Sequence, residues 1–166
     1  MSWGSDGPYF EDFEVGVTYK HWPGRTVTHE DNTLWCTLSM DFTPLYLDEE
    51  YARHTEHKRC VVNPRLVRAI VVGICVKDTT RNAVANLGTD YENLLQPVFP
   101  GESLYAQSTV VSKRESQSRP YAGVVTWIHE GYNQDGERIY ESKRSNLVYK
   151  VNSSPWAKLL QNGDLK

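Results

Sequence analysis

The side chains best suited to bind a metal ion gather in one short segment. His54 and His57 stand three residues apart, and Cys60 follows three residues later. Imidazole and thiolate groups are the ligands that zinc prefers. A structural zinc site normally adds a second ligand pair at a defined distance, and none is visible here. We therefore expect no metal or other cofactor, and we interpret the segment as a solvated helix end or a wall of a substrate pocket.

The three cysteines are the next candidates for chemistry. Cys36, Cys60 and Cys75 form no Cys-x-x-Cys pair, and an odd, scattered number is typical of reduced buried thiols rather than of a disulfide framework. A nucleophilic cysteine is the alternative, but no nearby residue in the sequence marks a base for it. The N-terminus also lacks a signal-peptide pattern, and the longest apolar stretch, residues 69–76, is too short to span a bilayer. We expect a cytoplasmic protein with no membrane partner.

A basic segment follows in the C-terminal half. Lys113, Arg114 and Arg119 surround a turn at residues 116–119, and guanidinium groups bind phosphate through charge-assisted hydrogen bonds. The alternative is an ordinary exposed hairpin, which has the same composition. The whole chain has 18 basic and 21 acidic residues and a formal net charge of −3. Because a nucleic-acid surface needs clustered basic residues in excess, we expect no nucleic-acid partner.

Short elements are expected to position the N-terminal candidates. Thr28 is followed three residues later by Asp31, which predicts a capped amphipathic helix over about residues 30–40. Pro44 disfavours helix at the residue before it, so a loop should present residues 41–46. Two more elements are expected on either side: a strand over residues 24–28 and a surface helix over residues 48–54 with an acidic first turn.

One longer helix is predicted in the middle of the chain. Residues 64–77 are apolar on every side in their second half, which predicts a helix buried all round. Pro64 suits the first helical position, with Asn63 as its N-cap. The β-branched residues leave a strand possible, but the length of about 14 residues favours a helix.

The remainder of the chain predicts a sheet. Four extended segments, residues 83–95, 103–112, 123–132 and 138–149, are separated by short turns, and Asn133-Gln-Asp-Gly136 is a strong hairpin signal. Consecutive strands joined by short turns form an antiparallel sheet. A buried helix followed by such a sheet predicts an α+β domain in which the sheet wraps the helix. The 166 residues fit one domain over residues 9–150, with a disordered segment 1–8 and a loose C-terminal extension 151–166.

Several motifs occur in this order along the chain. They are Tyr9-Phe-Glu-Asp-Phe-Glu-Val-Gly, Gly24-Arg-Thr-Val-Thr, Asp41-x-x-Pro-Leu, Asp48-x-x-Tyr-Ala, Val84-Ala-Asn-Leu-Gly, Pro97-Val-Phe-Pro-Gly-Glu-Ser-Leu-Tyr, Ser116-x-Ser-Arg-Pro and Asn133-Gln-Asp-Gly-Glu. Together they resemble the MaoC-like hydratase/dehydratase family of hotdog-fold proteins. The later motifs resemble the subgroup that acts on branched or carboxylated acyl-CoA thioesters.

This resemblance implies a fold, an assembly and a reaction. The fold is a curved antiparallel sheet around the central helix, and the assembly is a homodimer or higher homo-oligomer with active sites at the subunit junction. The reaction is the hydration of an enoyl thioester or the dehydration of a 3-hydroxyacyl thioester, carried by CoA or an acyl carrier protein. Such a hydro-lyase needs a base, an acid and a donor to the thioester oxygen.

The family's acid/base loop contains an Asp and a His. Asp41 matches the Asp, so the resemblance implies a catalytic carboxylate; the alternative is a local cap of the loop. Tyr46 stands where the family has His. A phenol has a pKa near 10 against about 6.5 for imidazole, so Tyr46 can donate a proton or orient water but is a poor base at neutral pH. The alternative for Tyr46 is an aromatic side chain that only fills space.

The oxyanion donor is also altered. The family's Gly at the start of the central helix aligns with Pro64, which has no N–H. Arg65 could compensate or bind a substrate carboxylate through its planar fork, or it could be an ordinary exposed residue. Asn63 could face the pocket or cap the helix, and Arg119 could meet the phosphates of CoA or of a carrier arm.

These departures leave two functions open. The first is a hydro-lyase on an acyl thioester that uses Asp41 and Tyr46 as the catalytic pair. The second is a hotdog protein that keeps the acyl-thioester pocket without ordinary hydration, as a binding module or a repurposed biosynthetic enzyme.

Overall fold

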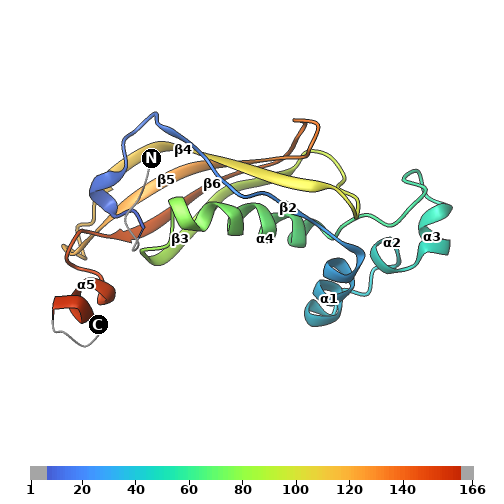
Figure 1. Cartoon of the computed structure of the whole chain (residues 1–166), viewed down its shortest axis with the longest axis horizontal. Coiled ribbons are helices and arrows are strands. Elements are labelled where there is room, and N and C mark those ends of the chain that lie inside the picture. The colour runs from blue at the N-terminus through green and yellow to red at the C-terminus, as the bar shows by residue number, and fades with distance from the viewer. Residues whose placement is uncertain (1–6, 162–166) are drawn as a thin grey trace.

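The sheet extends along the long axis of the molecule, and one helix lies along one of its faces (Figure 1). The computed structural model describes residues 7–161. The strands are β1 (Thr18–Lys20), β2 (Arg25–Thr26), β3 (Ala83–Leu94), β4 (Ser103–Glu115), β5 (Ala122–Tyr132) and β6 (Arg138–Tyr149). The sheet is antiparallel with the order β1-β4-β5-β6-β3, and β2 pairs with β4. The four long strands confirm the sequence prediction, which missed only β1.

The helices divide between the sheet face and its two ends. They are α1 (His29–Ser39), α2 (Pro44–Leu47), α3 (Glu49–Arg53), α4 (Pro64–Cys75) and α5 (Pro155–Gln161), and the short 3-10 turns are η1 (Phe10–Asp12) and η2 (Val76–Asp78). α4 lies along the sheet, α1 to α3 gather beyond one end of it, and α5 lies at the opposite end (Figure 1). None of these helices is long and apolar enough to cross a membrane within the described residues.

The β5–β6 hairpin forms for the reason that the sequence predicts. Asn133 Oδ1 accepts hydrogen bonds from the backbone N–H groups of Asp135 (3.1 Å) and Glu137 (2.9 Å). Gly136 has a φ of 79°, which a residue with a side chain rarely adopts. The turn therefore fixes the register of the two strands that form the centre of the sheet.

α4 starts as predicted but is not buried all round. Asn63 Oδ1 accepts from the backbone N–H of Arg65 (2.9 Å), and Pro64 occupies the first turn. One face packs on the sheet through Leu66, Val67, Ile70, Val71 and Cys75, whereas Arg65, Ala69 and Gly73 are exposed. The prediction of full burial was wrong because small residues, which count as apolar, occupy the outward stripe of the helix.

Close packing of α4 on the sheet depends on a missing side chain. A Cβ atom at Gly131 of β5 would lie 2.7 Å from Cγ2 of Val71 on α4. At the other end of the sheet, Phe13 packs edge-on against Trp127 with ring centroids 5.3 Å apart. The interior thus contains the α4 layer, a second cluster beneath the N-terminal segment and a smaller third cluster of Ala122, Val124 and Leu147.

Two loop predictions need correction. Residues 41–46 are not all loop, because α2 begins at Pro44, whose fixed φ suits a first helical turn as well as a break. The C-terminal extension is not loose up to residue 161: it contains α5, and the buried Ser154 hydroxyl lies 3.3 Å from that of Tyr9. The expected disordered segment 1–8 lies outside the described residues except for Gly7 and Pro8, which are buried.

Candidate functional site

Asp41 emerges where α1 ends. The helix begins at a capping box in which Thr28 Oγ1 accepts from the Asp31 N–H and Asp31 Oδ2 accepts from the Thr28 N–H. It ends at Met40, which adopts the left-handed conformation with a φ of 57°. The Asp41 N–H then donates to the Cys36 carbonyl oxygen (2.9 Å). The sequence therefore turns the chain sharply at the residue before the carboxylate.

Two hydrogen bonds hold the Asp41 carboxylate. Thr43 Oγ1 donates to Oδ1 (2.7 Å), and Asn63 Nδ2 donates to Oδ2 (2.8 Å). The first donor comes from the next turn of the chain and the second from the N-cap of α4. The carboxylate is half-buried, so it is oriented from inside the protein while one side remains open.

Asn63 connects Asp41 to the surrounding segments. It is 1% exposed, its N–H donates to Asn32 Oδ1 (2.8 Å), and its side chain both caps α4 and binds Asp41. Asn32 in turn donates to the carbonyl oxygens of Tyr46 (2.9 Å) and Val61 (3.1 Å). The polar side-chain atoms of Asn63 are thus engaged within the protein, in the cap of α4 and in the bond to Asp41.

The two candidate acid/base groups have pKa values shifted in opposite directions. The hydrogen bonds from Thr43 and then Asn63 lower the pKa of Asp41. Burial, and then the negative charge of Asp41, raise the pKa of Tyr46. At neutral pH the pair is therefore a carboxylate beside an intact phenol. A pair with pKa values shifted apart in this way has the chemistry of one proton acceptor and one proton donor.

Arg65 adds a positive charge beside this pair. Its charge contributes to the lowered pKa of Asp41 and partly offsets the raised pKa of Tyr46, and its side chain is exposed. Within residues 7–161 it has no carboxylate partner, unlike Arg68, which pairs with Glu92 (2.8 Å). The guanidinium is thus available to a ligand at the first turn of α4.

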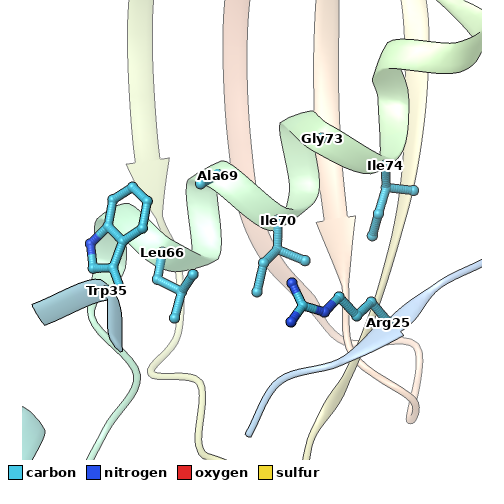
Figure 2. A pocket seen from close by; sticks show the side chains of 7 residues that line it. All are labelled: Arg25, Trp35, Leu66, Ala69, Ile70, Gly73 and Ile74. Atoms are coloured by element: carbon cyan, nitrogen blue, oxygen red, sulfur yellow. The ribbon is translucent and has the colours of Figure 1, made fainter. Parts of the chain in front are cut away.

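A cavity of about 460 Å³ lies along α4 on the side of β2 (Figure 2). Its lining residues are Arg25, Trp35, Leu66, Ala69, Ile70, Gly73 and Ile74. Trp35 stands over the first turn of α4, and Arg25 extends from β2 toward Ile70. Asp41 and Tyr46 do not line this cavity. Two of the lining residues are sequence neighbours of residues whose charge acts on Tyr46: Trp35 precedes Cys36, and Leu66 follows Arg65.

Arg119 lies far from Asp41 in the same copy of the chain. It belongs to the turn between β4 and β5, where it lines a cavity of about 380 Å³ together with Arg114, Ser116 and Leu87. β4 begins near the Asp41 end and has 13 residues, which span about 40 Å at the usual rise of a strand. The structure therefore does not bring Arg119 together with the other four predicted site residues.

The sequence analysis missed a buried chain of side chains under α4. Asp78 Oδ2 lies 2.9 Å from His21 Nδ1, His21 Nε2 lies 2.7 Å from Ser108 Oγ, and Ser108 Oγ lies 2.6 Å from His129 Nδ1. The first three residues have the order of a Ser-His-Asp triad, but Ser108 is 0% exposed. This hydrogen-bonded series of side chains therefore has a structural role, and its serine has no access to substrate.

The side chains of His54, His57 and Cys60 do not come together around one point. His54 Nε2 lies 3.3 Å from Glu50 Oε1 on the surface, and the His57 ring packs near Phe99. All three cysteines are buried and free. In the part of the chain that the structure describes, no group of three His, Cys, Asp or Glu side chains is placed to hold a metal ion.

An antiparallel sheet with one long helix packed along its face is the arrangement of a hotdog fold. A solved Mycobacterium tuberculosis protein described as a double hotdog fold superimposes with a TM-score of 0.81 at 20% identity, over 88% of this chain and 45% of that one. This likeness confirms the predicted fold.

The family follows from closer comparisons. The family model described as mesaconyl-CoA hydratase matches residues 4–155, and the chain belongs to this family. It is 34% identical over 143 residues, 86% of the chain, to mesaconyl-CoA hydratase of Haloarcula marismortui. A monoamine oxidase regulatory protein from Archaeoglobus has a TM-score of 0.77 at 30% identity, over 87% of this chain and 97% of that one. The chain spans about two fifths of the length of the first curated relatives.

Proposed function

We propose that this protein is a hydro-lyase that adds water to the double bond of an enoyl thioester, or removes it from the 3-hydroxyacyl product. The observation that supports this function most directly is the Asp41 carboxylate, ionised and held by Thr43 and Asn63 at the start of α4. A held carboxylate can accept a proton from water without first being ordered.

The proton balance of hydration follows from the two pKa shifts. Asp41 removes one proton from water as the oxygen attacks C3 of the enoyl group, and the electron pair of the double bond moves toward the thioester carbonyl. The second proton of water stays on the new C3 hydroxyl group, so C2 needs a proton from the protein, and the proton now on Asp41 restores the group that supplies it. The Tyr46 hydroxyl remains protonated, so it donates a hydrogen bond to the reacting atoms and can pass a proton to the enolate.

Arg65 suits a substrate whose acyl group carries a negative charge. Pro64 offers no N–H at the first helical position, so the thioester oxygen loses a donor that a Gly would provide. The unpaired guanidinium of Arg65 can bind a carboxylate on the acyl group through two parallel hydrogen bonds. We therefore propose an acyl group that carries a carboxylate, as the names of the curated relatives also suggest. Those names favour CoA as the carrier over an acyl carrier protein.

A second copy of the chain is proposed to close the site. Leu38, Met40 and Phe42 flank Asp41 and are 75%, 78% and 63% exposed, which is typical of a surface that a partner covers. β3 forms an edge of the sheet and also exposes leucine side chains. We propose a homodimer, in the cytoplasm, where the three free thiols would stay reduced.

The function is tested with mesaconyl-CoA, crotonyl-CoA and their hydrated products. The loss or gain of the enoyl-thioester absorbance on addition of the purified protein measures hydration or dehydration. We expect turnover that is fastest with the carboxylated thioester. Thioester binding without turnover of any substrate would contradict the enzyme and support the alternative function, an acyl-thioester binding module.

Arg65→Gln tests the proposed carboxylate contact. We expect KM for mesaconyl-CoA to rise about 10–100-fold, because a hydrogen-bonded charge contributes about 1.5–3 kcal/mol, while KM for crotonyl-CoA stays unchanged. Arg53→Gln, which removes an exposed cation of α3, serves as the matched control. Equal effects on both substrates would contradict a contact with the carboxylate.

Tyr46→Phe tests the phenol. The ring is retained and only the hydroxyl is lost, so we expect kcat to fall about 10–100-fold with little change in thermal stability. Steady-state kinetics at neutral pH measure the effect, and Tyr51→Phe, on the exposed α3, is the control. An unchanged kcat would show that Tyr46 only fills space.

A further inference from the structure

Arg144 is a buried cation without an anion. It lies on β6, is 8% exposed, and its Nε has no hydrogen-bond partner among the described residues. The nearby carboxylate of Glu92 is already paired with Arg68. A buried charge that is not compensated costs several kcal/mol, so this arrangement is incomplete as it stands.

Hydrogen-bond donors accompany the guanidinium. Tyr140, Ser142 and Arg144 alternate along β6 and so share one face. All three are buried, and Tyr140 packs in the cluster formed with α4. The hydroxyls of Tyr140 and Ser142 have no partner outside this pair within the described chain. This set of one cation and two hydroxyl donors suits an anion, because each member can donate to it.

The surrounding charges leave an excess of one positive charge. Arg68 and Arg144 are two cations, and Glu92 is one anion. His129, opposite Ser142 in the sheet, has its pKa lowered to about 3 by burial and is neutral, and burial raises the pKa of Cys75 to about 12. Burial and the charge of Arg68 also lower the pKa of Arg144. The next carboxylate, Asp78, acts on Cys75 but lies 2.9 Å from His21 Nδ1, and it is not among the main influences on Arg144.

We propose that an anion of carboxylate type binds between α4 and β6, held by the Arg144 guanidinium and the hydroxyls of Ser142 and Tyr140. The anion comes either from solution, as a small ion, or from the far end of a carboxylated acyl group. Arg68 is five residues beyond Asn63, about 7.5 Å along the helix axis, so the second source requires an acyl chain longer than one whose carboxylate binds at Arg65. Only the second source rests on the proposed function.

Thermal unfolding of the full chain tests the site. Sodium acetate and sodium chloride are titrated against the wild type, Arg144→Gln and the control Lys143→Gln, which removes an exposed cation of the same strand. At about twenty times the dissociation constant we expect the wild type and the control to gain about 4 °C more in Tm than Arg144→Gln. General salt effects cancel in this difference, and Arg144→Lys should restore part of the gain.

A second arm separates the two sources. Binding of glutaryl-CoA and of uncharged valeryl-CoA is measured by calorimetry with the same variants. If the anion is part of the acyl group, Arg144→Gln weakens glutaryl-CoA at least tenfold, leaves valeryl-CoA unchanged, and small anions give no difference in Tm. Wild-type crystals soaked in bromide give a readout even if Arg144→Gln does not fold: an anomalous peak beside the guanidinium supports a small anion. No difference in Tm, no preference for glutaryl-CoA and no peak would together overturn the proposal.

Discussion

Asp41→Asn is expected to reduce kcat about 10³-fold and to leave KM almost unchanged. The amide keeps the size of the side chain and can still contact Thr43 and Asn63, but it cannot accept a proton from water. Loss of a positioned acid/base group typically costs 10²–10⁴ in rate. The measurement is the enoyl-thioester absorbance with a saturating carboxylated substrate.

Asp48→Asn is the matched control for this substitution. Asp48 Oδ1 accepts from the Tyr51 N–H (3.0 Å) at the start of α3, and asparagine caps a helix as well as aspartate does. The same change of charge, seven residues away, should therefore leave kcat intact. An Asp41→Asn enzyme with unchanged kcat would refute the catalytic role of the carboxylate, while activity lost equally in both variants would indicate a general charge effect.

Acidification is expected to destabilise the protein from about pH 6.5 downward, chiefly through His129. Burial holds the pKa of His129 at about 3 in the folded state, below the value of about 6.5 in an unfolded chain. Above pH 6.5 the His129 side chain is neutral in both the folded and the unfolded protein, so its contribution to stability is fully present there. Between pH 6.5 and 3 the unfolded chain binds a proton that the folded chain does not, which costs up to about 4–5 kcal/mol.

Urea unfolding at several pH values between 7.5 and 4 measures this loss. In His129→Gln, which can still hydrogen-bond Ser108, the free energy of unfolding should be lower at pH 7.5 but fall less steeply with pH, by up to about 1.4 kcal/mol per pH unit. His54→Gln, on the exposed end of α3, should follow the wild type. Identical slopes in the wild type and His129→Gln would show that His129 does not drive the acid transition.

The parts of the structure that depend on local chemistry could be predicted from the sequence. The Thr28 and Asp31 capping box, the Asn133 to Gly136 hairpin and the Asn63 and Pro64 start of α4 each depend on residues a few positions apart. Such signals need no knowledge of the tertiary structure. Asp41 could be chosen by its place in a motif, and the structure then supplied its hydrogen-bond partners.

The contacts between distant segments could not be predicted. Asn63 and Asp41 are 22 residues apart, and His21 and Ser108 are 87 apart. They meet only because the register of the sheet and the end of α1 bring them together. Arg119 shows the converse: a plausible residue type in a plausible turn lies at the other end of β4, which depends on strand length and not on composition.

Asn63 uses one amide group for two tasks, with its oxygen on the first turn of α4 and its nitrogen on Asp41. The folding of that turn and the acidity of the carboxylate are consequently linked, and such linkage is reciprocal. A change that frays the turn should make Asp41 less acidic, and protonation of Asp41 should loosen the turn by the same free energy. The acidity of Asp41 therefore cannot be tuned independently of the helix that packs along the face of the sheet.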